Sequence, residues 1–590
     1  MLRSILAVSF AYLASTTPVI ANNERPNIVL ILADDLGYSD LASYGSEIET
    51  PHIDALADAG VRFTNYHTAA SCAPTRSMLL TGVDSHRNGV PNIPEMLPQD
   101  QLEHDNYKGV LNRNVATVAS ILQSSGYHTY MTGKWHLGKE QDNLPYVRGF
   151  ERTFAMGDSG ADNWEKKPYI PIYKDAFWTS DGKQTDLPED FYSSEFLIDK
   201  MIEFIDRNKG DAQPFFAYVP FQAVHIPVQA PQEFIDKYMN TYREGWQILR
   251  EQRQRRIKDL GIVSQDTEMV SMSTTGDWDS QDEETKKYQS KRMAVYAGMV
   301  DAMDHHIGRL IAYLKETGQY DNTIFIFTSD NGSEPSGADR VPSAISNAIM
   351  KRSQGYTGEY ETLGLKGSMN SMGPSFASAS ASPLSFYKFY AGEGGMRVPL
   401  IISGKGISRD AAWQRSFSYV TDITPTILDL TSVSHPGQFF GGRHIEQMIG
   451  KSLVPLLNKM TDRVYGANET VGYELGGNKV LFQGNYKLVY NIGPVGDNQW
   501  HLYDIDKDPG ETKDLAPSDS KRFQSMLNAY QRYAEANNVI PVPEGYNQYQ
   551  QLALNGLRTI ARENILLFLL TIAVLVPFML YARSHGKRRQ

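Results

Sequence analysis

The sequence IVLILADD, at residues 28–35, is a run of six apolar residues that ends in two adjacent carboxylates. A second run of the same kind, TIFIFTSDNG, occupies residues 323–332. Uninterrupted apolar runs of this length are typical of strands buried on both faces, as in a parallel sheet. Helical patterns lie between the two runs, at residues 115–125, 192–208 and 293–317. This alternation predicts an α/β domain whose active site lies at the carboxyl ends of its strands.

The character of the sequence changes near residue 460. Short apolar segments separated by Gly, Asn and Asp follow that point, and a helical pattern then occupies residues 520–537. Short strands joined by such turns are typical of an antiparallel sheet. We therefore expect a large α/β domain at residues 22–459 and a smaller α+β domain with an antiparallel sheet at residues 460–540.

The N-terminal residues 1–21 have the form of a signal peptide. Arg3 precedes a short apolar run, and Val19-Ile20-Ala21 provides the small residues of a cleavage site. The apolar run is too short to span a bilayer. An uncleaved anchor is the alternative.

The C-terminal residues 564–582 form an uncharged apolar block that is long enough for a transmembrane helix. A basic tail, residues 583–590, follows it and favours the cytoplasmic side. A buried helix is the alternative. We expect residues 541–563 to be a tether and the folded body to be exported. The chain would then be anchored in a bilayer such as the bacterial inner membrane, with its body on the periplasmic or extracellular side.

The chain of 590 residues has a formal net charge of -11. An acidic chain is a poor partner for nucleic acid, so we expect none. The charge leaves an anionic substrate open, because a few cations in a cleft can outweigh the overall sign.

Four oxygen-bearing side chains follow the two apolar runs: Asp34 and Asp35 follow the first, and Asp330 and Asn331 the second. Taken singly, each is a turn or a helix cap. If the two strands are neighbours, the four side chains form a site for a hard cation such as calcium. Zinc is disfavoured because the sequence has no clustered Cys or His ligands.

Cys72 is the single cysteine and stands in the sequence SCAPTR, residues 71–76. A buried free thiol is the ordinary interpretation of a lone cysteine. A helical pattern begins directly after it, with Pro74 in a position that a first helical turn tolerates. A helix start beside the cysteine would favour a bound anion.

Four more side chains follow strand-like segments or stand near glycine-rich ones. Lys134 and His136 belong to GKWHLG, His225 belongs to AVHIP, and Lys388 precedes EGGMRVP at residues 393–399. Taken alone, a histidine is more often structural and a lysine more often solvated.

Together these motifs are in the order found in type I sulfatases, and the chain resembles that family over residues 26–537. It is most similar to the bacterial arylsulfatase branch, within the alkaline-phosphatase-like superfamily. The resemblance implies a large domain with a mixed, mostly parallel sheet flanked by helices. The C-terminal apolar block lies outside the resemblance.

The resemblance also implies that a separate maturation enzyme oxidises Cys72 to formylglycine, whose hydrate is the nucleophile. One Ca²⁺ would be held by Asp34, Asp35, Asp330, Asn331 and the modified Cys72. Asp330 would help to deprotonate the attacking hydroxyl.

The other motif residues take roles from the same resemblance. Arg76 would orient the hydrated aldehyde, and Lys134 and Lys388 would hold sulfate oxygens. His225 would protonate the leaving alcohol, and His136 would deprotonate the second hydroxyl of the hydrate.

The expected function is hydrolysis of sulfate esters to an alcohol or phenol and inorganic sulfate, through a covalent enzyme–sulfate intermediate. One alternative is a phosphodiesterase or phosphoryl transferase of the same superfamily. Another is an inactive binder of sulfated glycans, in which residue 72 would remain a thiol. Aryl, alkyl and carbohydrate sulfates are all open as substrates. We expect specificity to lie in residues 88–101, 158–179 and a Ser-rich loop at 371–383.

Overall fold

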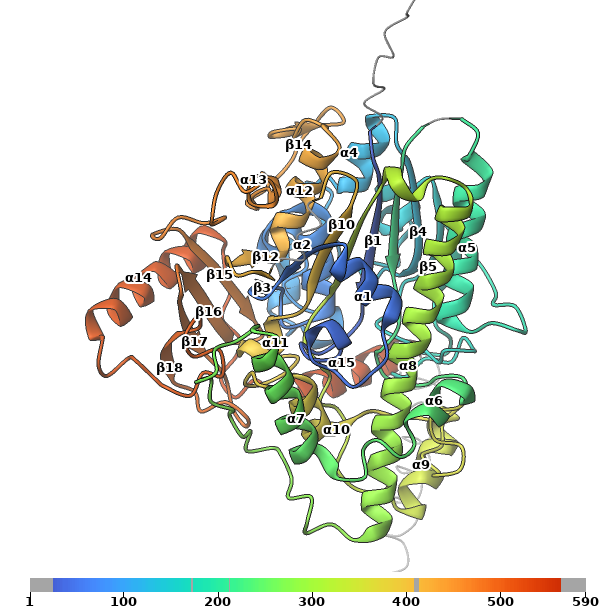
Figure 1. Cartoon of the computed structure of the whole chain (residues 1–590), viewed down its shortest axis with the longest axis vertical. Coiled ribbons are helices and arrows are strands. Elements are labelled where there is room, and N and C mark those ends of the chain that lie inside the picture. The colour runs from blue at the N-terminus through green and yellow to red at the C-terminus, as the bar shows by residue number, and fades with distance from the viewer. Residues whose placement is uncertain (1–24, 171–172, 212, 408–412, 564–590) are drawn as a thin grey trace, which may run out of the picture.

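The described part of the chain is a large α/β body with a smaller sheet domain packed against one side (Figure 1). The computed structural model describes residues 25–563 apart from 171–172, 212 and 408–412. The expected signal peptide, membrane span and basic tail lie outside these residues.

The large domain is organised around one twisted sheet. Its strands are β1 Asn27–Ala33, β2 Gly60–Phe63, β4 His128–Lys134, β5 Arg152–Met156, β6 Trp178–Ser180, β7 Lys183–Gln184, β8 Phe215–Pro220, β9 Thr323–Ser329, β10 Leu400–Gly404 and β11 Trp413–Gln414. Their order is β11-β2-β10-β9-β1-β8-β4-β5-β6-β7. The five central strands, from β9 to β5, run parallel. β10 and β6 pair antiparallel with their neighbours. The sheet is therefore mixed with a parallel centre, as predicted.

Helices cover both faces of this sheet (Figure 1). One face carries α1 Pro51–Asp58, α5 Ser193–Asn208 and α8 Glu283–Glu316, and both α1 and α5 contact α8. The other carries α2 Cys72–Thr81, α4 Val118–Ser124 and α12 Ile423–Leu430. Every residue of β1, β8 and β9 is buried as a result. Burial on both faces is the reason that these strands are continuously apolar.

Shorter elements complete the large domain. They are β3 Tyr66–His67, α3 Ser85–Asn88, η2 Pro94–Met96, α6 Gln232–Tyr238, α7 Gly245–Asp259, α9 Ala344–Gln354, α10 Gly373–Ser380, α11 Glu393–Met396, β12 Ser418–Tyr419, β13 Phe439–Phe440, β14 Arg443–His444 and α13 Val454–Leu457.

The smaller domain is an antiparallel sheet with one helix on it, as the sequence predicts. Its strands are β15 Thr470–Leu475, β16 Asn478–Gln483, β17 Tyr486–Tyr490 and β18 Trp500–Asp504, in sequential order. α14, Ser520–Ala536, packs Met526 and Tyr530 onto Leu481, Leu488 and Leu502 of the sheet.

Three segments differ from the sequence-based expectation. α8 begins at Glu283, ten residues before the predicted start, because the Asp282 carboxylate caps it by accepting from the Thr285 N–H at 2.7 Å. The Ser-rich segment 371–383, expected as a loop, contains α10, since its Phe376 packs against Trp246 and Trp278. Tertiary packing overrides the low helix propensity of serine there.

The expected tether, residues 541–563, is the third difference. It contains α15, Gln548–Glu563, which contacts η2 of the large domain. Asn555 of α15 donates to the backbone carbonyls of Glu95 and Leu97, both at 2.9 Å. The segment is therefore a docked helix. Within residues 25–563, none of the described helices combines the length and apolar character that a bilayer span requires.

Candidate active site

The predicted site residues come together at the carboxyl edge of the parallel strands. β1 and β9 are paired neighbours, with Ala33 opposite Ser329, so Asp34 and Asp330 leave adjacent strands at the same level. Lys134 ends β4, and His225 follows β8. The remaining members are contributed by helix α2 (Cys72, Arg76) and by loops (Asp35, His136, Asn331, Lys388).

Three carboxylates form the centre of the site. Asp34, Asp35 and Asp330 each place an oxygen within 4.8 Å of the others, and all three side chains are fully buried. Burial and the neighbouring carboxylates raise the pKa of Asp34, and burial raises the pKa of Asp35 to about 6. Arg76, Lys134 and Lys388 hold the pKa of Asp330 below its usual value despite its burial.

Two oxygen atoms at this centre have no protein partner. They are Asp34 Oδ1 and Asn331 Oδ1, both fully buried. An unsatisfied buried acceptor is costly, so such an atom calls for a ligand. A buried set of carboxylate and amide oxygens is the donor set that a hard divalent cation prefers. The residues present therefore fit calcium.

Arg76 pairs with two carboxylates of this centre, Asp330 and Asp34. Its Nε and Nη2 donate to Asp330 Oδ2 at 2.9 and 2.7 Å, and its Nη1 donates to the Lys134 carbonyl at 2.7 Å. Asp34 Oδ2 lies 3.5 Å from Nη2. The fork geometry of the guanidinium thus links α2, β4 and the end of β9.

Two lysines point into the same centre, one toward Asp34 and one toward Asp35. Lys134 Nζ donates to Asp34 Oδ2 at 2.6 Å, and Lys388 Nζ lies 2.9 Å from Asp35 Oδ1. Both side chains are at most 2% exposed. Buried ammonium groups this close to a metal-type oxygen cluster can bind the oxygens of a tetrahedral anion.

Cys72 is the first residue of α2, so the free N–H groups of that helix start surround it. Its sulfur lies within 4.8 Å of ligand atoms of Asp34 and His225. Burial raises the pKa of the thiol to about 11. An unmodified Cys72 is therefore a neutral thiol at neutral pH and a weak nucleophile.

The two histidines differ in their partners. His225 Nδ1 lies 2.6 Å from the Ile226 carbonyl, which assigns the proton to that nitrogen and directs Nε2 toward Asp35, 3.6 Å away. His136 has two ring nitrogens with no hydrogen-bond partner, and its backbone is left-handed, with φ 55°. Burial and the nearby lysines lower the pKa of both. Both rings are therefore neutral in the absence of an anion.

Two residues that the sequence analysis did not single out belong to the site. Glu334 pairs with Lys388 Nζ at 2.8 Å, and its carboxylate lies near both Asp35 and His225. Tyr169 packs its ring edge-on against His225, with centroids 5.2 Å apart. Glu334 stands three residues after Asn331, and that spacing was the available signal. Tyr169 had none beyond its place in the segment 158–179.

Close backbone packing explains a glycine of the motifs. A Cβ on Gly332 would lie 1.8 Å from the Gly394 carbonyl. The Gly332 N–H also donates to the Gly395 carbonyl at 3.0 Å. The DNG and EGG segments therefore interlock through bare backbone, which places Lys388 beside Asp35.

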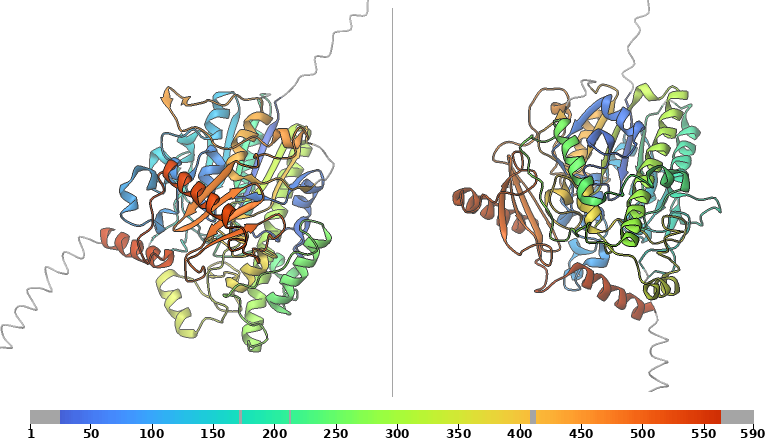
Figure 2. Two further views of the ribbon diagram at one scale, coloured as in Figure 1. Left: turned by 90° about the vertical axis from the view of Figure 1, so that its left-hand side faces the viewer. Right: turned by 60° about the horizontal axis from the view of Figure 1, so that its bottom comes forward.

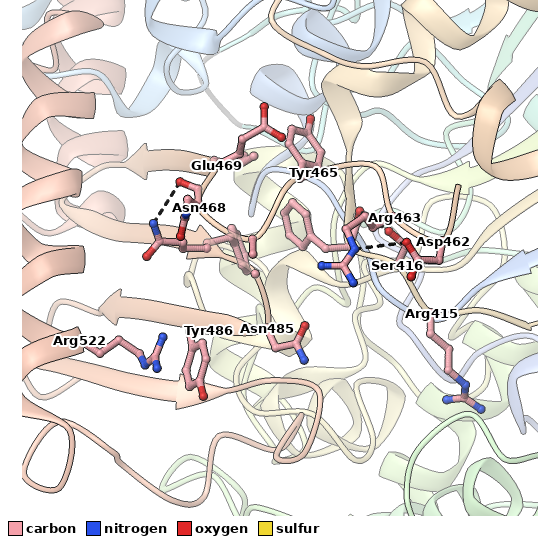
Figure 3. A pocket seen from close by; sticks show the side chains of 16 residues that line it. Arg415, Ser416, Asp462, Arg463, Tyr465, Asn468, Glu469, Asn485, Tyr486 and Arg522 are labelled. Carbon is pink, nitrogen blue, oxygen red and sulfur yellow. Dashed lines mark hydrogen bonds and ion pairs between the residues drawn. The ribbon is translucent and has the colours of Figure 1, made fainter. Parts of the chain in front are cut away.

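A cavity of about 550 Å³ lies away from this centre, beside the small sheet (Figure 3). Its arginines already have partners: Arg463 pairs with Asp462, Arg522 pairs with Asp519, and Arg415 donates to the backbone carbonyls of Gly261 and Ile262. None of the residues predicted for catalysis lines it.

The family model described as Sulfatase matches residues 26–433 of the chain. The chain belongs to the sulfatase family. An arylsulfatase of Klebsiella aerogenes is 34% identical over 458 residues, covering 77% of this chain and 96% of that protein. An uncharacterized sulfatase of Schizosaccharomyces pombe is 36% identical over 543 residues, covering 89% and 96%.

Solved structures place this sulfatase in the same fold. The crystal structure titled Ps i-CgsB has a TM-score of 0.62 at 22% identity and covers 91% of this chain and 97% of that one. BT4656, titled as a complex with D-glucosamine-2-N,6-O-disulfate, has a TM-score of 0.56 at 20% identity, covering 87% and 98%. These likenesses establish the fold of the sulfatase, and the family match establishes it as a sulfatase enzyme.

Proposed function

We propose that this sulfatase is an arylsulfatase-like hydrolase that cleaves sulfate esters through a formylglycine at position 72. The observation that carries the proposal is the place of Cys72. It starts α2 beside the carboxylate centre, within 4.8 Å of Asp34 and His225. Two buried lysines converge on the same centre.

The pKa of the Cys72 thiol supports its conversion. Burial raises that pKa to about 11, so the sulfur would stay protonated and could not attack an anionic ester. A thiol or hydroxyl nucleophile would also remain sulfated after one round. The hydrate of an aldehyde has a second hydroxyl on the same carbon and can release the group that it captures. We therefore propose a maturation enzyme as a partner of this chain.

In the first half of the reaction, one hydroxyl of residue 72 forms a bond to sulfur while the bond between sulfur and the ester oxygen breaks. Asp330 accepts the proton of the attacking hydroxyl. His225 donates a proton to the leaving oxygen, which departs as the alcohol. Lys134 and Lys388 bind the sulfate oxygens and stabilise their charge.

In the second half, His136 removes the proton of the remaining hydroxyl. The C–O bond to sulfate then breaks, sulfate leaves and the aldehyde is restored. Burial and the nearby lysines lower the pKa of His136, so it is neutral and able to accept a proton. Addition of water to the aldehyde regenerates the hydrate.

Calcium would be held by Asp34, Asp35, Asp330, Asn331 and the modified residue 72. Asp34 Oδ1 and Asn331 Oδ1 are the two buried atoms of this centre that have no hydrogen-bond partner and could bind the cation. A bound cation supplies positive charge that offsets the negative charge of the ester.

The acid role of His225 depends on the substrate. Burial, Lys134 and Lys388 lower its pKa in the free protein. An anionic ester placed between the lysines offsets their charge and raises the affinity of Nε2 for a proton. Tyr169, edge-on against His225, places an aromatic ring where the alcohol part of the ester would leave. Aryl, alkyl and carbohydrate sulfates all meet this requirement.

The deciding experiment is the mass of the peptide that contains residue 72, taken from active protein, together with two rate measurements. We expect the sulfur to be replaced by a carbonyl oxygen, and an aryl sulfate to be turned over much faster than a bis-aryl phosphate. A retained sulfur in active protein would overturn the mechanism. Faster cleavage of the phosphate diester would favour a phosphodiesterase, and a retained thiol without turnover would favour a glycan binder.

A further inference from the structure

Helix α15 is docked with its amphipathic pattern reversed. A helix on a protein surface ordinarily buries its apolar face and exposes its polar one. In α15 the inward side carries Gln548 and Asn555 beside Leu552, and Asn555 makes the two bonds to the backbone of Glu95 and Leu97. The outward side carries Leu554, Leu557 and Ile560, which are 50%, 64% and 43% exposed.

The outward residues are spaced by three along the helix, so they form one apolar strip. Arg558 and Arg562 are exposed on the same helix. An aliphatic strip with neighbouring arginines is the composition of a helix that lies in the boundary layer of an anionic bilayer. A protein–protein interface typically surrounds its apolar core with a rim of mixed polar residues, so this composition favours a membrane over a protein partner.

The sequence that follows α15 also indicates a lipid bilayer as the partner of this face. Residues 565–582 carry no charge and are long enough to cross a bilayer, and a basic tail follows them. If this stretch crosses a bilayer, as its composition predicts, the end of α15 is held at the membrane surface. Figure 2, right, shows α15 along the lower edge of the large domain, apart from the small sheet.

α15 also borders the active site. Tyr549 in its first turn packs against Phe389, with ring centroids 6.1 Å apart, and Phe389 follows Lys388. On its other side, the loop that Asn555 holds includes Glu95, which accepts from the Tyr173 hydroxyl at 2.9 Å. Tyr173 belongs to the same segment as Tyr169, the neighbour of His225.

We propose that the outward face of α15, formed by Leu554, Leu557 and Ile560, lies on a lipid bilayer and holds the active site beside it. The helix is then an orienting contact between the folded body and its membrane. Sulfate esters of amphiphilic alcohols, held at the membrane surface, reach the site at high local concentration. That consequence rests on the proposed function, whereas the contact itself does not.

The contact is tested on the full chain in the Cys72→Ala background, which removes the single native thiol. Leu557→Cys receives a small fluorophore, and the protein is placed in phosphatidylcholine–phosphatidylglycerol vesicles that contain a shallow nitroxide-labelled lipid. The matched control is Phe439→Cys, which is similarly exposed at 67% and lies on β13, the strand paired with β14 at the top of the body in Figure 1. We expect loss of fluorescence at position 557 and none at position 439.

Unquenched fluorescence at position 557, or equal quenching at both positions, would overturn the proposal. Quenching at 557 that depends on the density of labelled protein and not on the nitroxide lipid would assign the face to a second copy and would also overturn it.

A second measurement uses native residue 72 and the double variant Leu554→Asn, Leu557→Asn. We expect unchanged turnover of a water-soluble aryl sulfate and a several-fold loss for a long-chain aryl sulfate held in vesicles. Equal turnover of the vesicle substrate by variant and wild type would contradict the orienting role. If the wild type hydrolyses neither ester, the proposed function fails while the quenching result still decides the contact.

Discussion

At the scale of single residues, the site is a balance of buried charges. Four carboxylates, Asp34, Asp35, Asp330 and Glu334, share one centre with Arg76, Lys134 and Lys388. Without a cation, three of the carboxylates stand close together, and the pKa values of Asp34 and Asp35 are raised. The arrangement therefore favours a bound cation and then a bound anion.

Replacement of the nucleophile should separate chemistry from folding. Cys72→Ala removes a buried side chain at the start of α2. We expect turnover to fall ~10³-fold or more, with the far-ultraviolet circular dichroism spectrum unchanged. Cys72→Ser should capture at most one sulfate per chain, since a serine has no second hydroxyl with which to expel it. Steady turnover by purified Cys72→Ser would contradict this role.

His225 should matter most for poor leaving groups. His225→Ala removes the proton donor, and a general acid contributes about 10²–10⁴-fold to a step that needs protonation. We expect a large loss of kcat/KM for an alkyl sulfate and a small loss for a nitrophenyl sulfate, whose phenolate leaves without help. The kcat/KM values for both esters are measured on the same enzyme preparation. Equal losses would rule out the acid role.

Calcium should stabilise the fold through the carboxylate centre. A ligand that binds only the native state adds about 2.7 kcal/mol at a hundredfold excess over Kd. We expect calcium to raise Tm and a chelator to lower it. Asp34→Asn should lose most of the response, and Asp321→Asn, at an exposed position, should keep it. An identical shift in the two variants would place the ion elsewhere.

At the scale of elements, short polar contacts attach the small domain to the large one. His86 in α3 lies between two carboxylates. Its Nδ1 is 3.3 Å from Asp84, and its Nε2 is 3.0 Å from Glu474 of β15. The Tyr533 hydroxyl of α14 donates to the same Asp84 at 2.9 Å. These bonds raise the pKa of His86 to about 9 although burial opposes its charge.

That shift predicts how stability depends on pH. The pKa of His86 is above its unfolded value of about 6.5, so its contribution is fully present below pH ~6.5 and is lost as the pH rises through about 9. The contribution is of order 3 kcal/mol at most. We expect Tm to fall between pH 7 and pH 9.5 in the wild type. His86→Gln should have a lower Tm at pH 7 and a flatter profile, and a wild-type Tm constant over that range would contradict the assignment.

At the scale of the whole molecule, a buried ion cluster joins the small domain to helix α11 of the large one. Lys487 of β17 lies 2.9 Å from both Glu393 of α11 and Glu511. Glu393 also contacts His67 at 3.0 Å. Glu393 directly precedes Gly394 and Gly395, which interlock with Gly332, and Lys388 stands five residues before Glu393, so the small domain supports the anion site.

Replacement of Lys487 should therefore affect both the stability and the activity of the protein. Lys487→Met leaves two buried carboxylates without their ammonium partner, and breaking such a pair costs about 3–5 kcal/mol. We expect a lower denaturation midpoint and a reduced kcat. Lys513→Met, at an exposed position of the same domain, is the matched control. If both variants have the wild-type denaturation midpoint and kcat, the cluster does not help to attach the small domain to the large one.

The sequence by itself determined the buried central strands, the small antiparallel sheet and the polar side chains that follow the ends of the central strands. Local runs such as residues 28–33 and 323–328 reveal buried strands, because burial on both faces requires continuous apolar residues. The polar residues after them were predictable as a cluster, since parallel strands end at one edge.

Only the tertiary structure decided which distant residues meet. The pairing of Glu334 with Lys388, the edge-on contact of Tyr169 with His225 and the helix in the Ser-rich segment depend on packing between segments far apart in the chain. The outward direction of the aliphatic face of α15 depends on two bonds from Asn555 to the backbone near η2. Periodicity shows that a helix has two faces, and only its neighbours determine which one is turned away from the protein.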